Sequence, residues 1–310
     1  MGILNCTPDS FFDGGRYFDE KAAIRRGLEM VEEGADIIDI GGESTRPGAK
    51  EVSIEEELRR VIPVIKALKD HPISIDTCKP EVAEKALEAG ATLINDVTGF
   101  RQPEMRQIAA EAEVPVCVMH MQGSPRTMQH SPSYPKGVVT ELTEWFEKTT
   151  QRLLADGVKA EQIILDPGIG FGKTVEHNLE ILSNLATFRK LGFPLLIGLS
   201  RKSFMSKMIN LNFGLSSSDS EDFTSQISGF SAKVNGQRPF AKQKSTGDVR
   251  KIPEGEGEKP EVQVINKRSI DLLSTSLALN TMCILEGVAI VRVHDIKEHR
   301  EMIDVIGKLS

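Results

Sequence analysis

Residues 163–166 read Ile-Ile-Leu-Asp, a short apolar run that ends on a carboxylate. Seven further apolar runs punctuate the chain, and most of them also end on a polar residue: 1–5 (MGILN), 36–40 (DIIDI), 73–76 (ISID), 92–95 (TLIN), 115–120 (PVCVMH), 194–199 (PLLIGL) and 288–293 (VAIVRV). Continuous apolar runs of this length are typical of parallel strands that are buried on both faces. Stretches with helical apolar spacing separate the runs, which predicts βαβ units.

Eight such units are the number that closes a (β/α)8 barrel. We therefore predict an α/β protein, a (β/α)8 TIM barrel that forms a single domain over residues 1–310. In this fold the carboxyl ends of the strands converge on one mouth, where barrel enzymes keep their active sites. The polar residues that we expect at the mouth are Asn5, Asp76, Asn95, Asp96, His120, Asp166, Lys202 and His294.

Capping residues bound several of the predicted helices. Ser53 is the expected N-cap of one helix, and Glu56 three residues later completes a capping box. Proline at the start and glycine at the end bound another helix, over Pro80–Gly90. The remaining predicted helices are Ala22–Gly34, Val138–Leu154, Val175–Lys190 and Arg268–Gly287.

One segment, residues 211–264, departs from this pattern. It is rich in serine and then in glycine, lysine, glutamate and proline, and no period of a strand or a helix survives in it. Such composition predicts a mobile, low-complexity insertion before the last helix–strand unit. The simpler interpretation is a surface insertion that the fold tolerates, and the alternative is a regulatory or partner-binding role.

Composition narrows the class of protein. A chain of 310 residues with 39% hydrophobic and 27% charged residues fits a soluble globular protein, and the net charge of −7 argues against nucleic-acid binding. No apolar run is long enough to cross a membrane, and because the first predicted strand begins at Met1 we expect no signal peptide. The four cysteines are scattered, without a C-x-x-C pair, which is typical of a reduced protein. We therefore expect a cytoplasmic location.

Four cationic residues follow or lie within predicted strand ends: Arg46, Lys202, Arg292 and His294. Each alone is compatible with an ordinary surface base. Together at one barrel mouth, on an acidic protein, they predict an anion site, because guanidinium groups can hold phosphate oxygens bidentately. A phosphate or pyrophosphate is the ligand that fits.

Asp76, Asn95 and Asp166 form a second, acceptor-rich set. Buried carboxylates are costly unless donors match them. A heterocycle with an exocyclic amino group beside a ring N–H offers two parallel donors to a carboxylate, and Asn95 can serve a ring nitrogen or carbonyl. The alternative is that these carboxylates bond only backbone amides or Arg201.

The glycine-rich loop Asp166–Thr174 (DPGIGFGKT) resembles two nucleotide-binding motifs without matching either. A P-loop requires glycine where Pro167 stands, and a dinucleotide fingerprint requires glycine where Lys173 stands. We expect instead that the loop lets its backbone and Phe171 approach a flat ligand closely. No histidine pair has metal-ligand spacing, so we expect no tightly held protein metal.

Seven motifs occur in a fixed order: MGILNCTPDSFFDGG, DIIDIGGESTRPGA, SIDTCKP, LINDVTG, LDPGIGFGKT, GLSRKSF and VRVHD. Together they resemble the dihydropteroate synthase family, over the whole chain apart from residues 211–264. The resemblance implies a transferase that joins 6-hydroxymethyl-7,8-dihydropterin pyrophosphate to p-aminobenzoate, with Mg²⁺ as the metal. The products are 7,8-dihydropteroate and pyrophosphate of folate biosynthesis. It also implies inhibition by sulfonamides and a homodimer.

The resemblance assigns roles to the mouth residues. The implied pterin site comprises Asp76, Asn95, Asp166 and Lys202, with walls from Met119, Phe171 and Gly198. The implied pyrophosphate pocket comprises Asn5, Arg46, Arg292 and His294, with Asn5 also contacting a substrate-borne Mg²⁺. The implied p-aminobenzoate site comprises Phe11, Thr45, Pro47 and Ser203. The implied catalytic set is Asp166, Lys202, Arg292, His294 and Asn5.

Three alternatives compete with this interpretation. A pterin-binding methyltransferase domain, which serves a corrinoid partner, would share the acceptor cradle but needs no set of cations. An inactive homologue would use the mouth for binding alone, although all the expected mouth residues are in place. A phosphate-binding isomerase barrel would require a catalytic Glu, Lys and His arrangement that the sequence does not offer.

Overall fold

The computed structural model describes residues 1–7, 19–45, 49–124, 127–202, 204–208 and 272–309. Met1–Met208 and Leu272–Ser310 make up one compact unit. Its strands are β1 (Gly2–Asn5), β2 (Ile38–Gly41), β3 (Ile73–Asp76), β4 (Leu93–Asp96), β5 (Val116–Met119), β6 (Ile163–Asp166), β7 (Leu196–Ile197) and β8 (Ile290–Val291). Every predicted apolar run therefore overlaps a strand, and β2 and β4 each extend one residue beyond the run.

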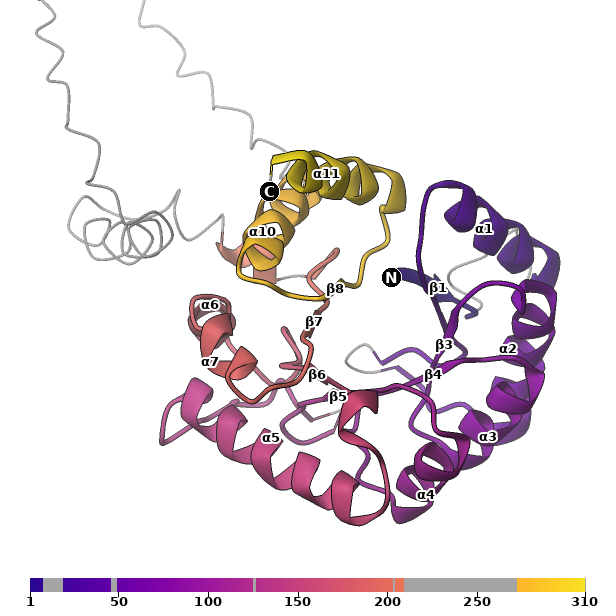
Figure 1. Cartoon of the computed structure of the whole chain (residues 1–310), viewed down its shortest axis with the longest axis horizontal. Coiled ribbons are helices and arrows are strands. Elements are labelled where there is room, and N and C mark those ends of the chain that lie inside the picture. The colour runs from indigo at the N-terminus through magenta and orange to yellow at the C-terminus, as the bar shows by residue number, and fades with distance from the viewer. Residues whose placement is uncertain (8–18, 46–48, 125–126, 203, 209–271, 310) are drawn as a thin grey trace, which may run out of the picture. The chain divides into compact units, whose positions relative to one another are not determined.

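The strands form a closed parallel barrel. Strands β1 to β6 pair in sequence order, β7 pairs with β8, and all pairings are parallel. Backbone hydrogen bonds join the two sheets on both sides: Leu165 N donates to Pro194 O at 2.9 Å, and Ile3 N donates to Val293 O at 2.9 Å. Figure 1 shows the strands inside a ring of helices. The predicted (β/α)8 barrel is confirmed.

The surrounding helices are α1 (Glu20–Glu32), α2 (Ile54–Leu68), α3 (Pro80–Ala89), α4 (Pro103–Ala112), α5 (Val138–Ala155), α6 (Val175–Leu182), α7 (Leu185–Arg189), α10 (Leu272–Leu285) and α11 (Ile296–Leu309). The N-cap prediction at Ser53 is confirmed, because its side chain accepts from the backbone N–H of Glu56 at 3.3 Å. The other half of the predicted capping box is wrong, because the carboxylate of Glu56 accepts from Arg59 and Arg60 instead.

The prediction of one helix over Val175–Lys190 is wrong, because the segment divides into α6 and α7. Asn184 lies between them with φ −126° and ψ 26°, and its Nδ2 donates to the carbonyl of Glu180 at 2.7 Å. An asparagine side chain that bonds a nearby carbonyl offers the backbone an alternative to continued helix. Apolar spacing alone does not register this competition.

Side chains alternate between the helix layer and the barrel interior along each strand, as the pleat requires. Outward residues such as Ile40, Ile75 and Leu165 join the large core between barrel and helices. Inward residues of or beside the even-numbered strands form two levels. The lower level, distant from the carboxyl ends, is apolar: Ile37, Leu93, Ile164 and Ile290. The upper level is polar: Asp39, Asn95, Asp166 and Arg292.

The predicted insertion, 211–264, lies outside the described residues, as do residues 268–271 of the last predicted long helix. Among the residues that the structure does describe, no helix is both long enough and apolar enough to cross a membrane.

Candidate active site

The candidate site lies at the carboxyl ends of the strands, above the apolar lower level of the barrel interior. Most of the sequence-predicted residues occupy inward positions there or in the loops that follow: Asn5, Asp76, Asn95, Met119, Asp166, Phe171, Gly198, Lys202, Arg292 and His294. Four predicted residues lie outside the described part of the chain: Phe11, Arg46, Pro47 and Ser203. Thr45 is described and is half-buried.

Arg292 is the centre of a buried polar network. Its Nε donates to Oδ2 of Asp39 at 2.6 Å, and its Nη2 donates to Oδ2 of Asp76 at 2.7 Å. Asn95 Nδ2 lies 3.3 Å and 3.4 Å from the two carboxylate oxygens of Asp39. One guanidinium therefore links side chains of β2 and β3, and through Asp39 it also reaches β4.

Burial and charge compete within this network. Burial raises the pKa of Asp76 to about 7, against the opposing effect of the Arg292 guanidinium. Burial by itself would lower the pKa of Arg292, but the carboxylates of Asp39 and Asp76 outweigh it and hold that pKa above its ordinary value. Arg292 therefore stays charged, whereas Asp76 titrates near neutrality.

Asp166 and Lys202 form the other half of the mouth. Asp166 Oδ1 accepts from the backbone N–H of Gly168 at 2.7 Å, and Lys202 Nζ donates to the carbonyl of Ile169 at 2.5 Å. The Nζ atom also lies 4.7 Å from the ring centroid of Phe171. Burial raises the pKa of Asp166 and lowers that of Lys202 to about 8, while their mutual attraction opposes both shifts.

Gly198 leaves room for the side chains of Lys202 and Arg292. A Cβ at Gly198 would lie 3.7 Å from Lys202 Nζ and 3.8 Å from Cβ of Arg292. A larger side chain at this position would therefore enter the space between the two cationic groups. The position supports the expectation that Gly198 forms part of a binding wall.

The glycine-rich loop after β6 has a backbone reason for its composition. Gly168, Gly170 and Gly172 have φ values of 66°, 80° and 65°, in the left-handed region that favours glycine. A Cβ at Gly168 would lie 2.0 Å from the carbonyl oxygen of His120, and one at Gly172 would lie 2.8 Å from Cβ of Gln122. Close packing against the loop after β5 thus demands glycine before any ligand is considered.

His294, after β8, is oriented by a residue of the loop after β7. Ser200 Oγ lies 3.0 Å from Nδ1 of His294 and accepts from the backbone N–H of His294 at 3.2 Å. The neighbouring Arg201 pairs with Asp295 at 2.5 Å. Arg201 is therefore bonded to Asp295, whereas Asp76 bonds Arg292 and Asp166 bonds a backbone amide.

Two residues that we expected to face the cavity, Asp96 and His120, make their polar contacts within the protein instead. The carboxylate of Asp96 accepts from the backbone N–H groups of Thr98 and Phe100, at 2.8 Å and 2.9 Å. His120 packs edge-on against Trp145, and its Nδ1 lies 3.0 Å from Nζ of Lys173. Asp96 shapes its own turn, and His120 supports the glycine-rich loop from below.

A buried ion cluster supports the loop that carries Thr45. Lys79 donates to the carboxylates of Glu43 and Glu57, and Glu43 also accepts from the backbone N–H of Val52 at 3.2 Å. Arg60 donates to the carbonyl of Gly42 at 2.8 Å. The described ends of this loop are therefore fixed to α2 and to the residue before α3.

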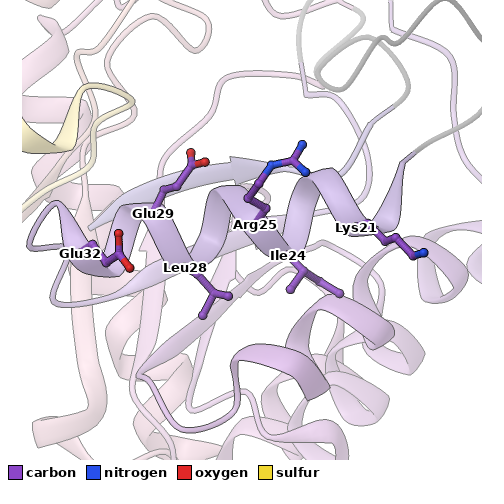
Figure 2. A pocket seen from close by; sticks show the side chains of 6 residues that line it. All are labelled: Lys21, Ile24, Arg25, Leu28, Glu29 and Glu32. Atoms are coloured by element: carbon purple, nitrogen blue, oxygen red, sulfur yellow. The ribbon is translucent and has the colours of Figure 1, made fainter.

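Two surface hollows lie elsewhere. One follows the outer face of α1, where Figure 2 shows side chains such as Lys21, Leu28 and Glu32. The other lies beside it, lined by residues of α1 and α11 such as Glu33 and Arg300. Both linings are dominated by charged side chains of mixed sign, and only the first includes apolar residues, so we assign them no ligand.

Sequence reasoning missed three residues. Asp39 lies in the middle of the apolar run DIIDI, and a charge inside a strand predicted to be buried was the available signal. Lys173 was considered only as a mismatch to a nucleotide motif, yet it is buried beneath the mouth. For Ser200 no sequence signal distinguishes its contact with His294 from an ordinary loop hydroxyl.

The fold and its polar mouth define a (β/α)8-barrel enzyme. The pterin binding enzyme family matches residues 1–236 of the chain. The dihydropteroate synthase of Synechocystis sp. is 50% identical over 214 residues, which cover 68% of this chain and 74% of that protein.

Solved structures of dihydropteroate synthases are also similar to this chain. The Yersinia pestis dihydropteroate synthase with a sulfonamide drug has a TM-score of 0.74 and 35% identity, covering 99% of this chain and 92% of that one. The Xanthomonas albilineans enzyme in complex with 7,8-dihydropteroate has a TM-score of 0.71 and 32% identity, with coverages of 99% and 92%. The chain belongs to the dihydropteroate synthase family of pterin-binding enzymes. Its activity is that of a transferase of folate biosynthesis, the synthesis of dihydropteroate.

Proposed function

We propose that the mouth divides into three subsites, one for each part of the dihydropteroate synthase reaction. Asp76, Asn95, Asp166 and Lys202 hold the pterin, between walls formed by Met119, Phe171 and Gly198. Asn5, Arg46, Arg292 and His294 hold the pyrophosphate. Phe11, Thr45, Pro47 and Ser203 hold p-aminobenzoate.

The observation that carries this proposal is that two carboxylates and two cations, largely removed from solvent, lie at one mouth: Asp76 bonds Arg292, and Asp166 and Lys202 attract each other. The pKa values of Asp76 and Asp166 are raised because the two groups are buried, so a ligand that donates to them relieves an existing cost. The amino group and ring N–H of a pterin are donors of the required kind. Lys202 lies close enough to Phe171 to face the same flat ligand from its edge.

The leaving group is matched by donors on the opposite side. Arg292 is held charged, and its Nη1 has no hydrogen-bond partner among the described residues. His294, oriented by Ser200, and Asn5, at the end of β1, lie at neighbouring strand ends because β1 and β8 adjoin. Their donors fit the oxygens of a pyrophosphate.

We treat Mg²⁺ as part of the pyrophosphate substrate. Within the described ranges, no three His, Cys, Asp or Glu side chains lie together as a metal site. The carboxamide oxygen of Asn5 is a ligand type that Mg²⁺ accepts, beside oxygens of the substrate itself. The ion would neutralise charge on the departing pyrophosphate.

The reaction follows from these positions. The bond between C9 of the pterin and the pyrophosphate oxygen breaks, and its electron pair leaves with the pyrophosphate. Arg292 and His294 stabilise the negative charge that develops there, and Asp166 stabilises the positive charge that develops on the pterin. The nitrogen lone pair of p-aminobenzoate then forms the new bond to C9, and the nitrogen releases a proton.

Assembly and location belong to the same proposal. Helix α10 is rich in apolar residues without a separate polar face, and its last residue, Leu285, is 61% exposed, while Leu309 on α11 is 83% exposed. A second copy of the chain would cover this surface, so we propose a homodimer. All four cysteines are free thiols, which suits the cytoplasm.

From composition alone, we propose that residues 211–264 are a dispensable insertion in the barrel domain. Replacing them with a short linker should preserve turnover. A folded deletion variant without activity would show instead that the segment contributes to function.

Pyrophosphate release from 6-hydroxymethyl-7,8-dihydropterin pyrophosphate and Mg²⁺, with and without p-aminobenzoate, tests the proposed function. We expect release that depends on p-aminobenzoate and is suppressed by a sulfonamide. A folded protein that binds the pterin without release would indicate a binding-only homologue. The methyltransferase alternative is disfavoured because it gives the charged Arg292 no anion to hold.

A further inference from the structure

Asp39 lies at an inward position of β2, and none of the three proposed subsites includes it. Its side chain is 0% exposed. Its Oδ2 accepts from Nε of Arg292 at 2.6 Å, and its two oxygens lie 3.4 Å and 3.3 Å from Nδ2 of Asn95. One buried carboxylate therefore contacts a proposed pyrophosphate ligand and a proposed pterin ligand.

The barrel layers explain why these groups meet. The upper polar level of the even-numbered strands consists of Asp39, Asn95, Asp166 and Arg292, one residue from each strand. In (β/α)8 barrels alternate strands contribute the four side chains of one interior layer. Asp39 is thus the member of this layer without a substrate to contact.

Because Asp39 is buried, loss of its pairing with Arg292 would be costly. A fully buried carboxylate is costly without a partner, and removal of one member of a buried ion pair leaves an uncompensated charge. Arg292 is bonded on one side to Asp39 and on the other to Asp76, whose side chain is 12% exposed. The two carboxylates are therefore not equivalent, because Asp76 is partly exposed and Asp39 is not.

A pterin that donates to Asp76 competes with Arg292 for this carboxylate. Asp39 is then the remaining anchor of the guanidinium, through Nε. With Nε and Nη2 both held at Oδ2 of Asp39, the plane of the guanidinium is fixed, and Nη1 is the group left to meet an anion. That geometry suits a pyrophosphate that arrives with the pterin.

We propose that Asp39 is a positioning residue that orients Arg292 for the pyrophosphate group while Asp76 changes partner to the pterin. The proposal rests on the proposed role of Arg292 as a pyrophosphate contact. It predicts an asymmetry: loss of the Asp39 charge weakens pyrophosphate binding, and loss of the Asp76 charge does not.

The test is titration calorimetry of inorganic pyrophosphate with Mg²⁺ into the full chain and its variants. Asp39→Asn should weaken pyrophosphate binding by about tenfold to a hundredfold, the loss expected for a charge-assisted hydrogen bond. Asp76→Asn should lower pterin affinity but change pyrophosphate affinity by less than about threefold. The matched control is Ser74→Ala: Ser74 is buried, pairs with Asp39 in the strand register, and its Oγ has no hydrogen-bond partner in the described part of the chain.

Folding is checked by thermal unfolding of each variant. If Asp39→Asn does not fold, Asp76→Asn decides the question alone: a loss of pyrophosphate affinity of more than about threefold would overturn the proposal, and a smaller change would support it. Where Asp39→Asn folds, it should have no further effect on pyrophosphate affinity in an Arg292→Gln background. A lower unfolding temperature with unchanged pyrophosphate affinity would show a structural role only and would overturn the proposal.

Turnover of the unaltered protein separates this inference from the proposed function. Wild-type protein that binds pyrophosphate but releases none from substrate would refute the reaction and leave the test of Asp39 intact. Wild-type protein with full turnover, together with an Asp39→Asn variant of normal pyrophosphate affinity, would refute the anchor alone.

Discussion

Ser200 Oγ lies within hydrogen-bonding distance of two nitrogens of His294, Nδ1 at 3.0 Å and the backbone nitrogen at 3.2 Å. The backbone N–H only donates, so the hydroxyl accepts from it and has its own proton to donate to Nδ1. When Nδ1 accepts this proton, the neutral ring carries its own proton on Nε2. The imidazole then presents a donor of the kind that a pyrophosphate oxygen requires.

Ser200→Ala should therefore weaken the leaving-group site without altering the p-aminobenzoate site. We expect kcat/KM for the pterin pyrophosphate to fall by about threefold to tenfold, the effect of one lost hydrogen bond, with KM for p-aminobenzoate unchanged. Steady-state pyrophosphate release measures both. Ser200→Thr keeps the hydroxyl and is the control; equal losses in the two variants would show that packing, not the hydrogen bond, matters.

Arg292→Ala should affect the pterin as well as the pyrophosphate. Because the guanidinium opposes the effect of burial on Asp76, its loss should raise the pKa of Asp76 above about 7 and leave the carboxyl protonated at neutral pH. A carboxyl that must be ionised to accept two donors then works only at higher pH. We expect free pterin to bind poorly near neutrality and better as pH rises.

Calorimetry of a free pterin between about pH 6.5 and pH 9 measures this dependence in both proteins. Arg201→Ala is the control, because Arg201 is an exposed arginine of the same mouth that pairs with Asp295. Pterin affinity that is the same in wild type and Arg292→Ala at every pH would contradict the coupling.

Asp166→Asn tests the acceptor cradle with little change of shape. The amide keeps one acceptor oxygen but places a donor where a carboxylate oxygen stood. We expect pterin affinity to fall by about tenfold or more, while binding of Mg²⁺ and inorganic pyrophosphate changes by less than about threefold. Equal weakening of both ligands in the same calorimetric titrations would remove Asp166 from a specific pterin role.

Lys173 predicts a pH dependence of stability. Burial lowers its pKa from 10.5 to about 7. Between these two values the unfolded chain binds a proton that the folded protein does not, so stability rises with pH across this window. It is lost again as pH falls toward 7, by about 1.4 kcal/mol per pH unit from this group.

Lys173→Met should remove that slope. It should also destabilise the protein by about 1–3 kcal/mol at pH 9, because the carbonyls of His120 and Phe171 lose a donor. Urea unfolding at about pH 7.5 and pH 9 measures the difference. Lys85→Met, which alters an exposed lysine paired with Glu88, serves as the control. A wild-type slope that survives in Lys173→Met would assign the effect to other groups.

Gly168 and Gly192 form a matched pair for the glycine-rich loop. Both have positive φ, but a Cβ would lie 2.0 Å from His120 O at Gly168 and would meet nothing within 4 Å at Gly192. Gly168→Ala should cost about 3 kcal/mol or more, from strain together with overlap, and Gly192→Ala about 1 kcal/mol from strain alone. Thermal and urea unfolding compare the two, and similar losses would show that the overlap relaxes cheaply.

The sequence predicted the barrel well because strand burial leaves a direct mark on composition. Runs such as Ile73–Asp76 and Ile163–Asp166 coincide with β3 and β6 to the residue. Helix division was harder, because the break at Asn184 depends on one side chain competing for a carbonyl. Apolar periodicity continues across that break.

The sequence predicted which residues belong to the site but not which side chains bond one another. Asp76, Asn95, Asp166, Lys202 and Arg292 were found because polar residues at the ends of buried strands must converge on the mouth of a parallel barrel. Their partners were not found. Asp39 holds Arg292 across the barrel from β8 to β2, residues that are far apart in the chain.

The sequence by itself therefore determined the fold class, the family and the chemical types present at the mouth, because these depend on local patterning and on motif order. Only the tertiary structure decided that Asp39 and Asp76 share one guanidinium, that Ser200 orients His294, and that Lys173 of the glycine-rich loop is buried against His120. These relationships arise from strand stagger and barrel closure, which bring side chains from different strands and loops into contact. No periodicity within a single strand encodes that geometry.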